Sequence, residues 1–253
     1  MFINTLASEW TKLRTTRSFW WTTALFILMS VGWAGVMGYT AMEADGGFPT
    51  IWASSIATAV YLLGFCVLMI QAIMIITTEY RYQVQSVTYL ATPRRWTVAL
   101  AKLLLYAAIA AILTFVVVVA GFLLADALAP ASAAALFEPF KDESALLIMW
   151  TFPTAAAALV VFSQGMALLL RQTAGTVALM LVWFMGLESI VRLIPNWGND
   201  IARFLPFENL NAFVMNTPVQ DAPWGVHGSG VYFFAWAVVL WVLGVVALQR
   251  RDA

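Results

Sequence analysis

The sequence predicts an all-α integral membrane protein with six membrane-spanning helices. Of its 253 residues, 62% are apolar and 10% are charged, whereas an average soluble domain has about 45–50% apolar and about 25% charged residues. A single core of this size cannot shield so many apolar side chains from water. Apolar stretches near the roughly 20 residues that cross a bilayer recur six times, and backbone in hydrocarbon must satisfy its own hydrogen bonds as a helix.

Composition and motifs exclude several classes of function. The 13 Lys and Arg residues balance 13 Asp and Glu residues, so no basic field for nucleic acid is expected. One cysteine and one histidine cannot form an intrachain disulfide or supply four zinc ligands. The sequence has no G-x-x-x-x-G-K-[ST] loop for nucleotide phosphates. We therefore expect no catalytic residue, metal or cofactor in this chain, and treat residues 1–253 as one transmembrane domain.

The first 17 residues predict an amphipathic helix at the membrane surface. Apolar side chains recur at helical spacing, with charged residues between them: Phe2, Leu6, Trp10 and Leu13. Trp20 and Trp21 then mark the water interface. No convincing small-x-small cleavage site follows, so the first span is expected to be retained rather than removed as a signal peptide. The segment fits either a simple anchor or an elbow leading into a transporter core.

The spans are expected at 19–41, 52–77, 98–124, 146–170, 174–195 and 231–249. Their orientation follows from the Lys and Arg residues in alternate connections, because positive charge stays on the cytoplasmic side. Ten of these cations flank the side that holds both termini, whereas Lys141 and Arg203 lie on the other side, with Arg192 close to it. Both termini are therefore expected in the cytoplasm.

The connection between the second and third spans is the only substantial cytoplasmic loop. Val84, Val87 and Leu90 recur at helical spacing, and Pro93 ends the pattern, which predicts a short amphipathic surface helix. The positive-inside rule explains the flanking cations, whose side chains can reach the interface. It does not explain Glu79, because a carboxylate at this edge helps neither topology nor lipid contact. A salt bridge or a partner's groove would account for it.

A second short helix is expected between the fifth and sixth spans. Residues 201–214, IARFLPFENLNAFV, are apolar but too short and too polar to cross the bilayer. Pro206, Pro218 and Pro223 interrupt any continuous helix around them. This segment is predicted to be re-entrant or interfacial.

Polar residues inside the spans need a partner or a role, because hydrocarbon penalises them. Glu188 and Arg192 are four residues apart on the fifth span and share a helix face; they are interpreted as a structural pair or as a gate. Gln71 and Gln164 could bond a neighbouring helix or contact a ligand. Methionine suits an adaptable cavity, although packing or lipid contact would explain it equally well. The residues considered for a substrate path are Phe65, Met69, Gln71, Met74 and Gln164.

These residues together resemble the membrane subunits of ABC-2 type (type V) ABC transporters, especially those of actinobacteria. Glu79-Tyr80-Arg81, with Thr88, Leu90, Ala91, Pro93 and Arg95 after it and Lys102 opening span three, is similar to the cytoplasmic coupling segment of that family. The stretch SEWTKLRTTRSFWW at 8–21 is similar to its opening helix, and RFLPF at 203–207 to the segment after span five. Gln83 and Val84 stand where Gly and Thr are common in the family.

The resemblance implies a permease subunit of an ATP-driven exporter in the bacterial plasma membrane. Two permease copies, identical or closely related, would form the path, and a separate cytoplasmic ATPase chain would bind ATP and Mg. The residues that it implies for coupling are Glu79, Tyr80, Arg81, Thr88, Leu90, Pro93 and Arg95. The substrate would be amphipathic or apolar, such as a drug, a peptide or a lipid-like molecule. The alternative is a non-transporting scaffold or sensor that anchors a cytoplasmic partner.

Overall fold

The computed structural model describes residues 2–43, 50–83 and 94–250. Among them, six helices are long and apolar enough to cross a membrane, which confirms the predicted fold class. Their bounds are Arg17–Tyr39 (α2), Ala53–Arg81 (α3 Ala53–Ala59, η1 Val60–Gly64 and α4 Phe65–Arg81), Arg95–Leu128 (α6), Glu143–Leu170 (α8), Thr173–Arg192 (α9 Thr173–Val182, η2 Trp183–Leu187 and α10 Glu188–Arg192) and Val226–Arg250 (α13). The remaining helices are α1 (Phe2–Thr15), α7 (Ala131–Ala134), α11 (Gly198–Ala202) and α12 (Pro206–Met215).

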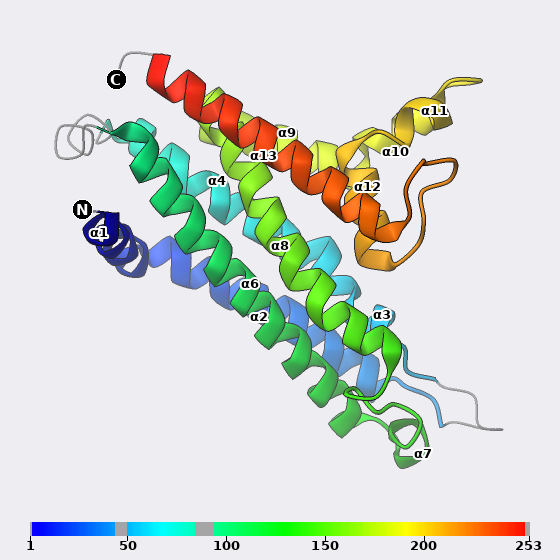
Figure 1. Cartoon of the computed structure of the whole chain (residues 1–253). Coiled ribbons are helices and arrows are strands. Elements are labelled where there is room, and N and C mark those ends of the chain that lie inside the picture. Colours follow the sequence, from blue (N-terminus) through cyan, green and yellow to red (C-terminus); the bar gives the residue numbers. More distant parts are fainter. Residues whose placement is uncertain (1, 44–49, 84–93, 251–253) are drawn as a thin grey trace.

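The spans form an elongated bundle with α8 at its centre (Figure 1). Helix α8 packs against α4, α6 and α13. In its most apolar stretch of 18 residues, 67% are buried. Rows of alanine on α8 let these helices approach closely. In the outer spans α2 and α13, only 22% of the most apolar stretch of 18 residues is buried. Their exposed apolar faces are suited to hydrocarbon.

Both termini lie at one end of the bundle, which we call the terminal end (Figure 1). Helix α1 lies there and packs against α6 and α2. The helix predicted for residues 1–17 is therefore present. The surface helix predicted between spans two and three falls on 84–93, outside the described residues. The side of the bundle away from the termini, called the distal end below, holds α7 at its tip, with α11 and α12 beside the start of α13.

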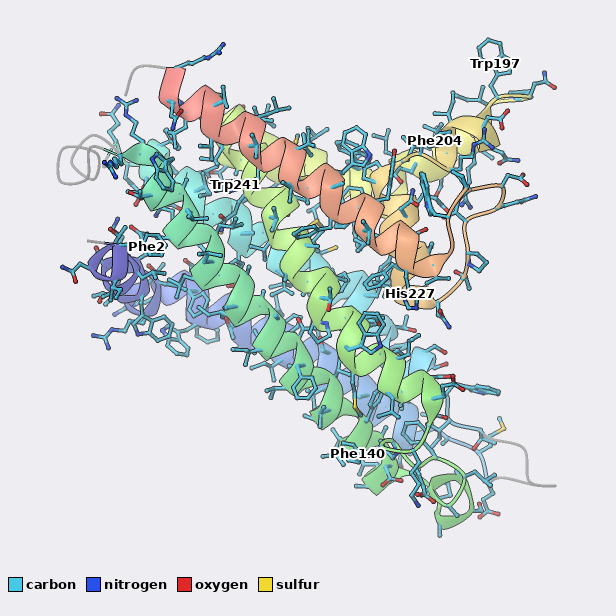
Figure 2. The ribbon with its side chains drawn as sticks, viewed as in Figure 1. Phe2, Phe140, Trp197, Phe204, His227 and Trp241 are labelled. Carbon is cyan, nitrogen blue, oxygen red and sulfur yellow. The ribbon has the colours of Figure 1, made fainter. Side chains whose placement is uncertain are left out.

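The short helix predicted within residues 201–214 is present as α12, and α11 ends at Ala202 just before it. Helix α12 begins with Pro206, whose missing N–H is not needed at a first helical position. It ends at Met215, and the next residue, Asn216, has a left-handed backbone with a φ of 53°. It packs against α13 and α8, whereas Trp197 before α11 projects away from the bundle and is 72% exposed (Figure 2).

The last span begins at Val226, five residues before the predicted boundary. The sequence HGSG at 227–230 has too little apolar content to signal a span. Tertiary packing explains the helix there, because α12 lies against it. A Cβ atom on Gly230 would stand 2.6 Å from the Phe213 ring, so a glycine is what allows this close contact.

Candidate functional site

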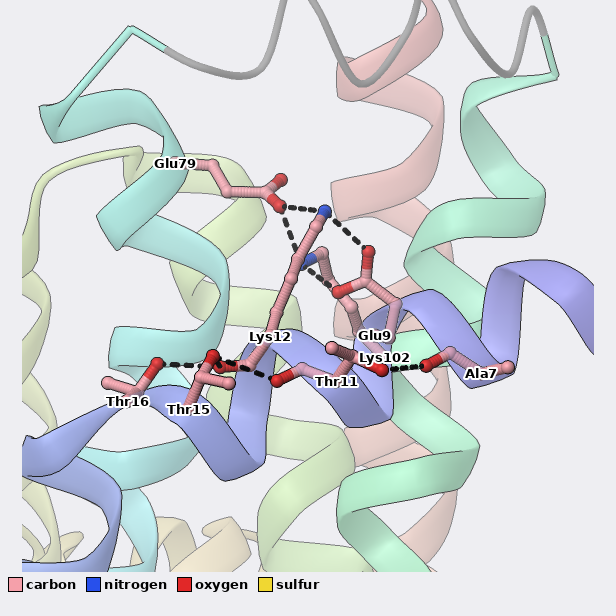
Figure 3. Close-up of polar contacts among 8 residues, drawn as sticks. All are labelled: Ala7, Glu9, Thr11, Lys12, Thr15, Thr16, Glu79 and Lys102. Atoms are coloured by element: carbon pink, nitrogen blue, oxygen red, sulfur yellow. Dashed lines mark hydrogen bonds and ion pairs between the residues drawn. The ribbon is translucent and has the colours of Figure 1, made fainter.

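Four charged side chains from three helices meet at the terminal end (Figure 3). Lys102 Nζ on α6 lies 2.5 Å from Glu9 Oε2 on α1 and 2.9 Å from Glu79 Oε1 on α4. Lys12 Nζ, one turn after Glu9, lies 2.7 Å from Glu9 Oε1 and 2.9 Å from Glu79 Oε1. Each cation thus contacts both carboxylates. We call Glu9, Lys12, Glu79 and Lys102 the four-charge cluster.

The burial of this cluster makes its pairing necessary. Glu9 and Lys102 are each 5% exposed and Glu79 is 8% exposed, and an unpaired charge in such surroundings costs several kcal/mol. The two cations and two carboxylates leave no net charge. Burial lowers the pKa of Lys12, but hydrogen bonds and charge attraction from Glu9 and Glu79 outweigh it, so its pKa is raised above the ordinary value. Of the two explanations open for Glu79, a salt bridge or a partner's groove, the structure contains the salt bridge.

Local sequence holds α1 in place beside the cluster. Glu9 and Lys12 are three residues apart and lie on one helix face. The last turn is reinforced by Thr15 and Thr16, whose hydroxyls donate to carbonyl oxygens of α1 (Figure 3). The Trp20 indole N–H then donates to the Arg14 carbonyl oxygen at 2.7 Å. These bonds fix the elbow between α1 and α2.

A second polar layer lies deeper between α2, α4 and α6. Gln71, 4% exposed, places Nε2 within 2.6 Å of Thr22 Oγ1 and 3.0 Å of Thr23 Oγ1, and it also donates to the Phe19 carbonyl at 3.1 Å. The Tyr106 hydroxyl donates to Gln71 Oε1. Gln71 therefore makes interhelical hydrogen bonds, one of the two interpretations open from the sequence.

The structure does not gather all five residues considered for a substrate path. Phe65, Met69 and Gln164 are fully buried in the core, where Gln164 Nε2 approaches the Lys102 carbonyl at 3.5 Å. Gln71 and Met74 instead line a cavity at the terminal end. The structure thus divides the set into core residues and cavity residues.

The described residues of the expected coupling segment lie on different helices. The Arg171 guanidinium stands over the Tyr80 ring at 5.0 Å, and Arg81 stands over the Tyr82 ring at 5.8 Å. Arg95 Nη1 donates to the Leu248 carbonyl at 3.4 Å, which joins α6 to α13. Thr88, Leu90 and Pro93 lie outside the described residues.

At the distal end, Glu188 and Arg192, interpreted from the sequence as a structural pair or as a gate, contact different groups of α12. In the described structure Arg192 forms its ion pair with Glu208. Glu188, 5% exposed, accepts the backbone N–H groups of Phe207 at 3.0 Å and Glu208 at 2.6 Å. It also accepts the Trp183 indole N–H at 2.6 Å. The reason is that the first amides of α12 have no intrahelical acceptor, and Glu188 supplies one.

Sequence reasoning missed Glu9, Lys12 and Lys102 as partners of Glu79. The available signal was the Glu9–Lys12 spacing on an amphipathic helix together with a lysine inside an apolar span. No group of three or more His, Cys, Asp or Glu side chains able to hold a metal occurs among the residues that the structure describes. The cluster is thus a junction of helices held by charge.

The sequence was compared with curated proteins and with models of protein families. A search of curated proteins gives no match. The family model of the ABC-2 family transporter proteins matches residues 5–187, a stretch that includes all four residues of the four-charge cluster. Because the match covers more than half of the chain and six apolar helices can cross a membrane, this multi-pass membrane protein belongs to the ABC-2 transporter family.

Proposed function

We propose that the chain is the permease subunit of an ATP-driven exporter and that two copies of it work with separate ATPase chains. In this proposal the terminal end faces the cytoplasm. The ATPase, which carries ATP and Mg, docks on the segment that joins α4 to α6. An amphipathic or apolar substrate, such as a drug, a peptide or a lipid-like molecule, passes along spans two and five.

The four-charge cluster is the observation that carries the coupling part. Glu79 stands in the last turn of α4, immediately before the proposed docking segment. Through Lys12 and Lys102 it contacts α1 and α6. A force applied to the end of α4 would therefore reach α1 and α6 as well, because separating them leaves buried charges unpaired. The cluster makes three elements respond together to one docked partner.

The exposed apolar side chains of span five support the substrate and dimer parts. Only 17% of its most apolar stretch of 18 residues is buried, and Met185 is 73% exposed. Such a surface is suited to lipid, to a second copy or to an apolar substrate. The cations concentrated beside the spans at the terminal end support a cytoplasmic location for that end.

The first test is purification of the tagged chain in mild detergent with any co-purifying ATPase. We expect a stoichiometric ATPase whose activity rises with the permease, and we expect Glu79→Gln to reduce that stimulation about tenfold while the ATPase stays bound. Glu143→Gln is the matched control, because Glu143 is exposed at the far end of α8. Thermal unfolding of each variant identifies loss of fold.

Two results would contradict the proposal. A folded Glu79→Gln variant with unchanged stimulation would remove the cluster from coupling. A permease that purifies without any ATPase, or that binds a cytoplasmic protein without ATPase activity, would favour the scaffold function.

A further inference from the structure

A cavity of about 690 Å³ opens at the terminal end between α1, α2, α4 and α6. This volume lies in the range of about 300–1,000 Å³ that is typical of small-molecule sites. The four-charge cluster forms part of its wall, and Arg81 and Tyr82 extend that wall at the end of α4. The cavity is thus bounded by the same helices that the cluster joins.

The lining is charged at one end of the cavity, apolar in the middle and hydrogen-bonded around Gln71 at the other end. Glu79 and Arg81 lie at one end, and Gln71 lies about eight residues before them on the same helix, a rise of about 12 Å. Phe19, Met74 and Leu105 supply apolar surface between these levels. Because the polar groups around Gln71 already bond one another, this lining suits an amphiphile whose charged head lies beside Glu79 and Arg81 and whose apolar stem lies against the middle of the cavity.

The charge of the lining favours an anionic head. Three cations face two carboxylates, and both carboxylates are already shared by Lys12 and Lys102. In the described part of the chain, Arg81 has no carboxylate partner, and it is exposed. The Lys12 side chain is 42% exposed, so its ammonium is accessible to a ligand. Guanidinium and ammonium groups together are typical of phosphate recognition.

We propose that this cavity binds an anionic phospholipid from the membrane leaflet at the terminal end. The phosphate contacts Arg81 and Lys12, and the upper part of one acyl chain lies against Phe19, Met74 and Leu105. The volume holds a headgroup and part of a chain, so the rest of the lipid stays in the bilayer. A bound lipid would bridge α1 and α4 beside the four-charge cluster. The site is independent of whether an ATPase docks on this chain.

Native mass spectrometry of the delipidated chain in detergent tests this site, with phosphatidylglycerol and phosphatidylcholine of identical chains as ligands. We expect phosphatidylglycerol to bind more tightly than phosphatidylcholine. Arg81→Gln should weaken phosphatidylglycerol about fivefold and leave phosphatidylcholine unchanged. Arg14→Gln, an exposed change on α1 outside the cavity lining, is the control and should have no effect.

A second pair of variants tests the apolar wall. Leu105→Trp fills the cavity and should weaken phosphatidylglycerol more than tenfold. Leu104→Trp is the matched control, because Leu104 is 48% exposed and does not line the cavity. Thermal unfolding shows whether each variant is folded. If Leu105→Trp does not fold, the Arg81→Gln comparison alone decides.

Three outcomes would overturn the proposal. Equal binding of the two lipids would mean that the cavity does not recognise the anionic head. Equal weakening by Arg81→Gln and Arg14→Gln would place the lipid elsewhere on the surface. Displacement of phosphatidylglycerol by inorganic phosphate alone, at similar concentrations, would show that a free phosphate rather than a lipid is the ligand.

Discussion

The two ends of the bundle stabilise a buried carboxylate in different ways. At the terminal end, Glu79 is surrounded by the ammonium groups of Lys12 and Lys102. At the distal end, Glu188 accepts backbone N–H groups at the start of α12 and the Trp183 indole. A lysine ammonium carries three rotatable N–H donors, whereas the backbone N–H groups at a helix start point in fixed directions. The contacts at the terminal end therefore hold three helices together, whereas the contacts at the distal end fix the orientation of α12 relative to Glu188.

This difference determines how the loss of one group from each set of contacts should affect stability. Removing a cation from the four-charge cluster leaves buried charge behind, which affects the stability of the whole junction. Removing Glu188 leaves amides of α12 unsatisfied, which is a local loss. Four measurements distinguish the two ends, in decreasing order of the expected effect.

Lys102→Met should be the most destabilising of these changes. It leaves Glu9 and Glu79, both buried, with only the half-exposed Lys12. We expect the free energy of unfolding to fall by about 3–5 kcal/mol, measured by denaturation in detergent. Lys141→Met removes an exposed cation from an exposed pair and should cost less than about 1 kcal/mol. Similar losses for both lysines would show that the cluster contributes no more than a surface pair.

Glu188→Ala should destabilise the distal end by about 2 kcal/mol, because charge-assisted bonds to Phe207 and Glu208 are lost. Hydrogen exchange should accelerate in α12 and stay unchanged in α1. Glu143→Gln, at an exposed position, serves as the control. Faster exchange in α1 as well would mean that the two ends are coupled, and the contrast between them would fail.

Gly38→Ala tests whether the distal end tolerates added volume where α2 meets α6. A Cβ atom there would stand 2.3 Å from the Ala125 carbonyl oxygen and 2.7 Å from its Cα. The helices must separate, at a cost of about 1–2 kcal/mol in unfolding experiments. Gly32→Ala, on the same helix, meets nothing within 4 Å and should be neutral or stabilising. Equal effects would show that α2 and α6 can part freely.

The smallest effect concerns pH and Lys12. Burial lowers the pKa of Lys12, but Glu9 and Glu79 raise it by more than burial lowers it, so the pKa lies above the ordinary 10.5. A raised folded-state pKa stabilises the protein below the unfolded pKa, and this contribution disappears as the pH rises through the folded value. The stability difference between wild type and Lys12→Met should be constant near neutral pH and shrink above about pH 10.5. A difference independent of pH would exclude the ammonium as its source.

Hydropathy predicted the six spans well because each is long and strongly apolar. The ends were less accurate, and α6 shows why. It runs from Arg95 to Leu128, several residues beyond the apolar stretch at 98–124. Arg95, Thr97 and Asp126 lower the hydropathy near these ends, yet the backbone hydrogen bonds of the helix continue through them. Boundaries therefore follow from packing and capping that the sequence pattern does not record.

The site was only partly predictable. Glu79 stood out, because a carboxylate at that place needed a partner. Its partner Lys102 is 23 residues away, and Lys12 is 67 residues away, so no local spacing identifies them. The distal end misled for a similar reason, since Glu188 and Arg192 share a helix face but find closer partners on α12. Interactions between distant segments require the fold.

The four-charge cluster also has a consequence for synthesis. Glu9 is made 93 residues before Lys102, so the cluster cannot be complete until the start of the third span has been made. Until then two carboxylates share the single ammonium of Lys12. A chain interrupted before residue 102 would lack one of the two lysines that contact both carboxylates. All four residues of the cluster precede α8 in the chain, so the cluster can join α1, α4 and α6 before the central helix has been made.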